Sequence, residues 1–128
     1  MDLRDKRIIV TGGKGFLGSH LVERLEALGA GPISAPRSAE CDLVDPRAVG
    51  QLFTAFRPDL VFHLAARVGG IGANQKNPGA YFHDNMMMGV NVLEQGRVAQ
   101  VPKIVMVGTI CAYPKFAPIP FREAALWN

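Results

Sequence analysis

Three glycines near the amino terminus have the spacing of a phosphate-binding turn. Gly12, Gly15 and Gly18 recur at intervals of three. They follow the apolar β-branched run Ile8–Val10 and precede leucines at helical spacing. Glycines in such a turn let the backbone approach a pyrophosphate, and the first N–H groups of the following helix supply donors at the positive end of its dipole. The order of strand, glycine turn and helix therefore predicts a dinucleotide-binding loop.

The register of this glycine motif stays open on spacing alone. Gly13, Gly15 and Gly18 also fit a G-x-G-x-x-G pattern. Thr11 favours instead the T-G-x-x-G-x-x-G spacing that is typical of short-chain dehydrogenases/reductases. A glycine-rich turn without a ligand is the simpler alternative, and the flanking strand and helix patterns argue against it.

Two cations lie where the adenosine ribose of a dinucleotide is expected. Folds that select NAD place an acidic side chain at the end of the second strand. That position here is Ala35-Pro36-Arg37, without a carboxylate, and Lys14 lies inside the glycine loop. Because two cations suit a 2′-phosphate, the sequence favours NADP(H). The alternative, that both side chains are solvated surface cations, leaves NAD(H) open.

Strands that alternate with amphipathic helices must position these groups. The expected strands are Ile8–Val10, Pro32–Ala35, Leu60–Ala65 and Ile104–Val107, with a brief extended piece at Asp42–Leu43. The expected helices are 17–28, one that begins at Pro46 behind an Asp45 N-cap and ends before Pro58, and 79–99, while 66–78 and 109–128 are expected to form loops. This order predicts an α/β fold of Rossmann type, a doubly wound parallel sheet with helices on both faces.

Each expected helix carries apolar side chains along one face. They are Leu17, Leu21, Leu25 and Leu28 in the first helix, Val49, Leu52, Phe53 and Phe56 in the second, and Phe82, Met86, Val90 and Leu93 in the third. Helical spacing of this kind predicts packing against the sheet. Met86–Met88 are likewise better explained by core packing than by a binding surface. The strand 104–107 is expected to be buried.

The composition limits the class of protein. The chain has 128 residues, of which 48% are hydrophobic and 20% charged, with a formal net charge of +3. Its cations are scattered, so no nucleic-acid partner is implied, and no apolar run has the length of a membrane span or the pattern of a signal peptide. Cys41 and Cys111 are expected to be free thiols of a cytoplasmic protein. His20, His63 and His83 share no metal-ligand spacing, so no metal site is expected.

The last twenty residues differ from the rest of the chain. Residues 109–128 contain three prolines and no strand or helix pattern. A dinucleotide fold of two halves has about six strands, more than are expected here. We therefore expect residues 1–128 to form one NAD(P)-binding domain that the chain ends inside.

Five segments together resemble the extended short-chain dehydrogenases/reductases, and within them the GDP-L-fucose synthase family. They are TGGKGFLG, CDLVD, HLAARVGGIGAN, DNMMMGVNVLE and GTICAYPK. The resemblance covers essentially the whole chain but only the first part of such an enzyme. It implies an NADP(H)-dependent epimerase/reductase that converts GDP-4-keto-6-deoxymannose to GDP-L-fucose. It also implies a GDP-sugar substrate and a homodimer of the full-length enzyme.

The resemblance further implies which residues hold the cofactor. The two cations match positions that bind the 2′-phosphate, and Asp42 and Leu43 match a pair that contacts the adenine. Without the resemblance, Asp42 is as well explained as a loop acid. Small residues after the third strand let the backbone approach the cofactor, and Asn85 matches an inward asparagine that supports the active site. The implied set is Gly12, Lys14, Gly15, Phe16, Leu17, Gly18, Arg37, Asp42, Leu43, Leu64, Ala65, Ala66 and Asn85.

Two residues after the last strand match catalytic positions of this family. Thr109 matches the hydroxyl residue that hydrogen-bonds the substrate carbonyl, and Cys111 matches the cysteine that acts as acid and base in epimerisation. Thiols as a class titrate close enough to neutral pH to exchange the acidic protons beside a keto group. The ordinary alternative is a buried, inert cysteine.

The Tyr-x-x-x-Lys pair that completes hydride transfer in this superfamily does not occur in the chain. Tyr81 is followed four residues later by Asn85, and Tyr113 by Ala117. We therefore expect this chain alone to be inactive. Two other interpretations stay open. One is another NAD(P)-dependent nucleotide-sugar epimerase/dehydratase, such as a GDP-mannose 3,5-epimerase, and the other is a non-catalytic dinucleotide-binding module.

Overall fold

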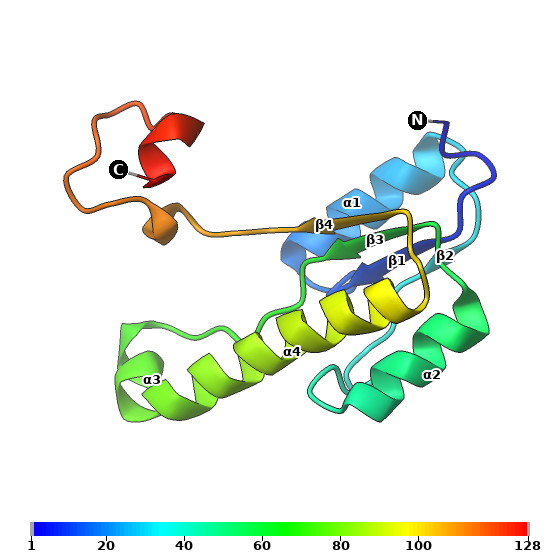
Figure 1. The fold of residues 1–128 in the computed structure, drawn as a ribbon, viewed down its shortest axis with the longest axis horizontal. Coiled ribbons are helices and arrows are strands. Elements are labelled where there is room, and N and C mark those ends of the chain that lie inside the picture. The colour runs from blue at the N-terminus through cyan, green and yellow to red at the C-terminus, as the bar shows by residue number, and fades with distance from the viewer. Residues whose placement is uncertain (1, 128) are drawn as a thin grey trace.

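A parallel sheet lies at the centre of the molecule. The computed structural model describes residues 2–127. Within them the sheet has four strands, in the order β2-β1-β3-β4 (Figure 1). The strands are β1 (Ile8–Thr11), β2 (Ile33–Ser34), β3 (Leu60–His63) and β4 (Lys103–Met106). Every neighbouring pair is parallel, so the carboxyl ends of β1 and β3 lie side by side. The predicted Rossmann-type α/β fold is confirmed.

Helices cover both faces of this sheet, α1 on one face and α2 with α4 on the other (Figure 1). The alternation of side chains along β1 explains the two layers. Ile8 and Val10 pack with Leu25 of α1, whereas Ile9 packs with Phe53 of α2. The helices are α1 (Phe16–Ala27), α2 (Pro46–Phe56), α3 (Ile71–Lys76) and α4 (Pro78–Val98).

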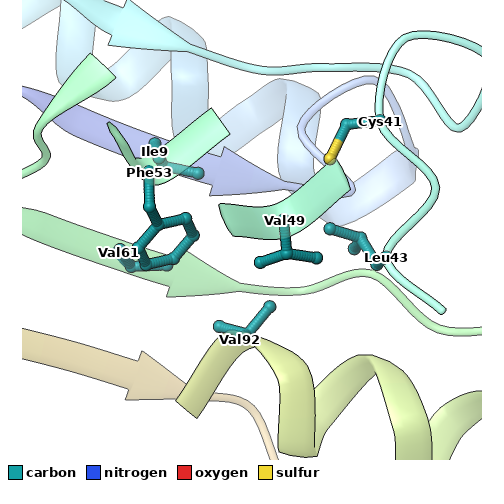
Figure 2. Packing of buried hydrophobic residues seen from close by; sticks show 7 residues of the cluster. All are labelled: Ile9, Cys41, Leu43, Val49, Phe53, Val61 and Val92. Carbon is teal, nitrogen blue, oxygen red and sulfur yellow. The ribbon is translucent and has the colours of Figure 1, made fainter. Parts of the chain in front are cut away.

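The core under α2 and α4 is built from side chains of these two helices and of the strands β1 and β3. Figure 2 shows Val49 and Phe53 projecting from α2 and Val92 from α4 toward Ile9 and Val61 of the sheet. None of these five side chains is more than 1% exposed. Burying each one contributes about 1.5–3 kcal/mol to stability. The predicted apolar face of α2 is therefore confirmed.

The start and end of α2 follow from local sequence. The Asp45 side chain accepts a hydrogen bond from the Arg47 N–H at 2.9 Å, and Pro46 occupies the first turn. At the other end Arg57 adopts a left-handed conformation, with φ of 51°, just before Pro58. The predicted N-cap at Asp45 and the predicted helix end are confirmed.

Two predicted local structures are wrong. Asp42 and Leu43 form a turn rather than an extended piece, because Asp42 accepts from the Val44 N–H through its side chain at 2.9 Å and from the Asp45 N–H through its carbonyl at 3.1 Å. The predicted loop 66–78 contains the short helix α3. Its glycines left the local sequence without a clear helix signal.

Several predicted core residues are exposed. On α1, Leu21 packs on the sheet and Leu25 is buried, whereas Leu17 and Leu28 lie at the helix ends and are 55% and 53% exposed. The larger difference concerns α4. The predicted apolar face is at least 47% exposed at every position, and the face that packs on the sheet centres on Val92 and Gly96. The exposed face consists of Phe82, Met86, Val90 and Leu93.

The strand β4 is an edge strand rather than a buried one. It pairs with β3 on one side and ends the described sheet on the other. Met106 and Val107 are consequently 40% and 56% exposed. Beyond β4 the chain runs away from the sheet (Figure 1). As predicted, residues 109–127 are irregular apart from the short 3-10 helices Ile110–Ala112 and Glu123–Trp127; residue 128 lies outside the described range.

Candidate dinucleotide-binding cleft

The glycine loop lines a cleft at the carboxyl end of the sheet. The cleft has a volume of about 810 Å³ and is bounded by the glycine loop, segment 36–44, the residues that follow β3, and Asp84 and Met88 of α4. Among the described residues, every predicted cofactor-binding residue except Asn85 lines it. These are Gly12, Lys14, Gly15, Phe16, Leu17, Gly18, Arg37, Asp42, Leu43, Leu64, Ala65 and Ala66. The topology thus brings together residues from three separate parts of the chain.

Two glycines of the loop have no room for a side chain. Gly12 has φ of +71°, and a Cβ there would lie 2.7 Å from the Ala65 nitrogen. A Cβ on Gly18 would lie 2.6 Å from the Gly13 Cα. Without a side chain at Gly12, the loop lies against Ala65, which follows β3. Without one at Gly18, α1 lies against the loop. The positive φ at Gly12 favours the register in which Thr11 precedes the first glycine.

The amino terminus of α1 opens onto this cleft. Gly15 is its N-cap and has no side chain to satisfy the first-turn donors. The Ser19 N–H is bonded to the Gly15 carbonyl at 2.9 Å, which leaves the earlier N–H groups of the helix without intrahelical partners. Phe16, Leu17 and Gly18 all line the cleft, and no acidic residue lies in the first turn. Unpaired donors and the positive helix end suit an anionic phosphate.

Two exposed cations flank the same cleft. Lys14 and Arg37 both line it, and neither takes part in an ion pair between described residues. The turn that carries Arg37 is held locally, because the Arg37 N–H donates to the Glu40 carboxylate at 2.7 Å and its carbonyl accepts from the Cys41 N–H at 3.0 Å. The two side chains are therefore available to an anion.

A buried asparagine holds the part of the cleft wall formed by Leu43 and Val44. Asn91 of α4 is 5% exposed and donates from its amide to the carbonyls of Leu43 at 2.9 Å and Val44 at 3.0 Å. The backbone of the predicted adenine-contacting pair is thereby fixed to α4. Sequence analysis missed this residue; its only signal is a polar side chain between Val90 and Val92.

Asn85 does not line the cleft, but it holds the backbone of Arg67, which does. Its side chain accepts from the Arg67 N–H at 2.7 Å and donates to the Arg67 carbonyl at 2.9 Å. The Arg67 guanidinium pairs with Asp84 and lies 5.0 Å from the Tyr81 ring centroid. Hydrogen bonds from His83 and Arg67 lower the pKa of Asp84. The family resemblance implied an inward Asn85, whereas no sequence pattern indicates the Arg67–Asp84 pair, whose members are distant in sequence.

The predicted catalytic residues lie outside the cleft. Thr109 and Cys111 follow β4, are exposed, and are not among the described residues that line the cleft. The Thr109 hydroxyl accepts from the Cys111 N–H at 3.2 Å and so caps the 3-10 turn that carries the cysteine. The cap fixes the Thr109 side chain to the backbone of Cys111.

Three other sequence-based expectations can be compared with the structure. Cys41 is buried, Cys111 is exposed, and both thiols are free. Burial raises the pKa of the Cys41 thiol. Within residues 2–127 no three or more His, Cys, Asp or Glu side chains are grouped closely enough to hold a metal ion. Nor does any helix in this range have the length and hydrophobicity needed to cross a membrane.

A parallel sheet with a glycine loop at its carboxyl edge defines a Rossmann-type α/β domain. The chain belongs to the NAD dependent epimerase/dehydratase family, whose model matches residues 8–127.

Within this family, the chain is similar to enzymes that act on GDP-sugars. The chain is 35% identical over 121 residues to the GDP-L-fucose synthase of Escherichia coli strain K12, covering 94% of this chain and 38% of that protein. MlghC, a GDP-mannoheptose C4 reductase from Campylobacter jejuni with NADP bound, superimposes with a TM-score of 0.89 at 31% identity, covering 97% of this chain and 39% of that one. A GDP-L-fucose synthetase from Naegleria fowleri bound to NADP superimposes with a TM-score of 0.81 at 30% identity, covering 96% of this chain and 36% of that one. The chain thus spans less than half the length of these proteins.

Proposed function

We propose that residues 1–128 form the NADP(H)-binding domain of a nucleotide-sugar epimerase/reductase. The observation that carries the proposal is the cleft itself, which joins a glycine loop, free helix donors and two cations that form no ion pair within residues 2–127. The similarity to an E. coli GDP-L-fucose synthase and to two NADP-bound relatives supports a GDP-sugar as substrate. The reaction that fits best is conversion of GDP-4-keto-6-deoxymannose to GDP-L-fucose, in a full-length protein that is a homodimer.

Each part of the cleft has a role in this proposal. The first-turn N–H groups of α1 bind the pyrophosphate, and Lys14 with Arg37 binds the 2′-phosphate. Asp42 and Leu43 contact the adenine, and Ala65 and Ala66 allow close approach of the cofactor because their side chains are small. NADPH, when bound, supplies the hydride that reduces a keto group.

Two residues outside the cleft are proposed to act on the sugar. The Thr109 hydroxyl hydrogen-bonds the substrate carbonyl, and the Cys111 thiol exchanges protons at the carbon beside it. In a form of the enzyme that turns over the 4-keto sugar, Cys111→Ser should stop solvent deuterium uptake at the epimerised carbons and leave some NADPH consumption. Wild-type uptake in this variant would show that the thiol is structural.

A non-catalytic dinucleotide-binding module is the second candidate, because the cleft accounts for cofactor binding without any catalytic step. It differs from the first candidate in turnover and not in cofactor binding. An enzyme that contains this chain and consumes NADPH with the 4-keto sugar excludes the module. A full-length protein that contains this chain and binds NADPH but does not turn over the 4-keto sugar excludes the reductase.

Cofactor preference tests the proposal. The chain should bind NADPH more tightly than NADH. Arg37→Ala and Lys14→Ala should each weaken NADPH binding by about 1.5–3 kcal/mol, or about 10- to 150-fold, and change NADH binding little. Arg24→Ala is the matched control, because Arg24 is an exposed cation of α1 outside the cleft-lining set of described residues. Equal affinities in wild type, or an unchanged preference in Arg37→Ala, would refute the assignment.

A further inference from the structure

A buried polar pair lies beneath the floor of the cleft. Thr11 and His63 are register partners at the carboxyl ends of β1 and β3. They are 1% and 7% exposed, and the Thr11 Oγ1 lies 2.8 Å from His63 Nδ1. Thr11 lines the cleft, and Gly12 follows it directly. His63 is not among the residues proposed to contact the cofactor.

The hydrogen bonds of the Thr11 hydroxyl fix the direction of this contact. Its oxygen accepts from the Ala65 N–H at 3.4 Å. The hydroxyl has one proton, and His63 Nδ1 is its only recorded acceptor among the described residues. Donation of this proton to Nδ1 satisfies the hydroxyl and places the proton of the neutral imidazole on Nε2. Burial lowers the pKa of His63, which agrees with a neutral ring.

The same hydroxyl joins the two loops that form the cleft. The Leu64 N–H also donates to the Thr11 carbonyl, at 3.1 Å. A Cβ on Gly12 would lie 2.7 Å from the Ala65 nitrogen, so the two backbones already touch. A Thr11 side chain that rotates away from His63 releases the Ala65 N–H, and the segment after β3 is then free to shift relative to the glycine loop.

We propose that His63 is a positioning residue for cofactor binding, whose ring orients the Thr11 hydroxyl so that it holds the glycine loop and Ala65 in register. This inference rests on the proposed function, because it concerns the same cleft. His63 itself does not touch the cofactor. Its effect on affinity passes through Thr11 to the backbone of the glycine loop and of Ala65.

Paired substitutions separate positioning from stability. Thr11→Val keeps the side-chain shape without the hydroxyl, and His63→Leu removes the acceptor. Each should weaken NADPH binding to the 128-residue chain about tenfold, because buried groups lose their partners. Thr11→Ser retains the hydroxyl, and His63→Asn places an amide near the position of Nδ1, so both should bind NADPH more tightly than the apolar variants.

Phe53→Leu is the matched control for a loss of stability. Phe53 is 1% exposed and lies on α2, outside the described cleft-lining residues. It should lower the melting temperature and leave NADPH affinity unchanged. The inference is overturned if Thr11→Val binds NADPH as tightly as wild type, or if Phe53→Leu weakens binding as much at the same loss of melting temperature.

The protonation state of His63 in the wild-type chain tests the inference even if the variants fail to fold. The imidazole nitrogen-15 signals of wild-type His63 should show an unprotonated Nδ1 and a protonated Nε2. A protonated Nδ1 would overturn the inference. If wild type binds neither NADPH nor NADH, the proposed function and this inference both fail. If wild type binds NADPH and Thr11→Val binds equally well, only this inference fails.

Discussion

Replacing Gly18 with alanine tests whether the cleft depends on close packing of α1 against the glycine loop. A Cβ on Gly18 would lie 2.6 Å from the Gly13 Cα and 2.8 Å from the Gly12 carbonyl carbon, against 3.4–4 Å for ordinary contact. Both neighbours are backbone atoms, so the helix or the loop must move by roughly 1 Å. Overpacking of this kind costs about 1–3 kcal/mol, which outweighs the gain of about 0.5–1 kcal/mol from removing a helical glycine.

The expected net result for Gly18→Ala is a loss of up to about 2.5 kcal/mol in the free energy of unfolding. The assay is urea denaturation followed by far-ultraviolet circular dichroism. Because the displaced loop carries the phosphate donors, NADPH affinity should fall at least about tenfold as well. Gly79→Ala is the control: it lies in the first turn of α4, and a Cβ there meets nothing described within 4 Å. It should be neutral or slightly stabilising. A Gly18→Ala chain with wild-type stability and NADPH affinity would refute the reasoning.

Three further predictions concern other parts of the fold. Asp45→Ala should lower the free energy of unfolding by about 1 kcal/mol through loss of the α2 N-cap, with Asp45→Asn close to wild type in the same denaturation assay. Asn91→Ala should cost about 2–3 kcal/mol by the same measure, because it leaves two carbonyls of the cleft wall without their donor, and wild-type stability would contradict this. Burial lowers the pKa of His63 from 6.5, so the unfolded chain binds the proton more readily. The His63 contribution to stability should therefore be complete above pH 6.5 and lost as pH falls toward the folded-state pKa. The difference in the free energy of unfolding between wild type and His63→Asn across pH 5–8 isolates this contribution. A difference that stays constant over this range would contradict the assignment.

Features set by local sequence could be predicted. The apolar runs of β1 and β3, the Asp45 cap and the glycine turn each depend on a few neighbouring residues, and each is found where expected. The location of the cleft also follows from sequence, because the carboxyl ends of parallel strands meet at one edge and the matched motifs lie after those ends; every predicted cofactor-binding residue except Asn85 lines it.

Features set by tertiary packing could not be predicted. Helical spacing identifies the apolar face of α4, but it does not show whether another element covers that face. The packed face instead uses Gly96, where a Cβ would clash with Ile104 Cδ1, so the helix and β4 approach closely. The contacts of Asn91 with Leu43 and of Arg67 with Asp84 join residues that are distant in sequence, and neither leaves a periodic signal.

The central claim, that a dinucleotide binds in the cleft at the carboxyl ends of β1 and β3, is tested most directly by mapping. NADPH is added to the nitrogen-15-labelled 128-residue chain, and amide shift changes are measured residue by residue. The largest changes should fall on 12–18, Arg37, 42–43 and 64–66. An unchanged spectrum at saturating NADPH, or largest changes on the exposed apolar face of α4, would contradict the claim.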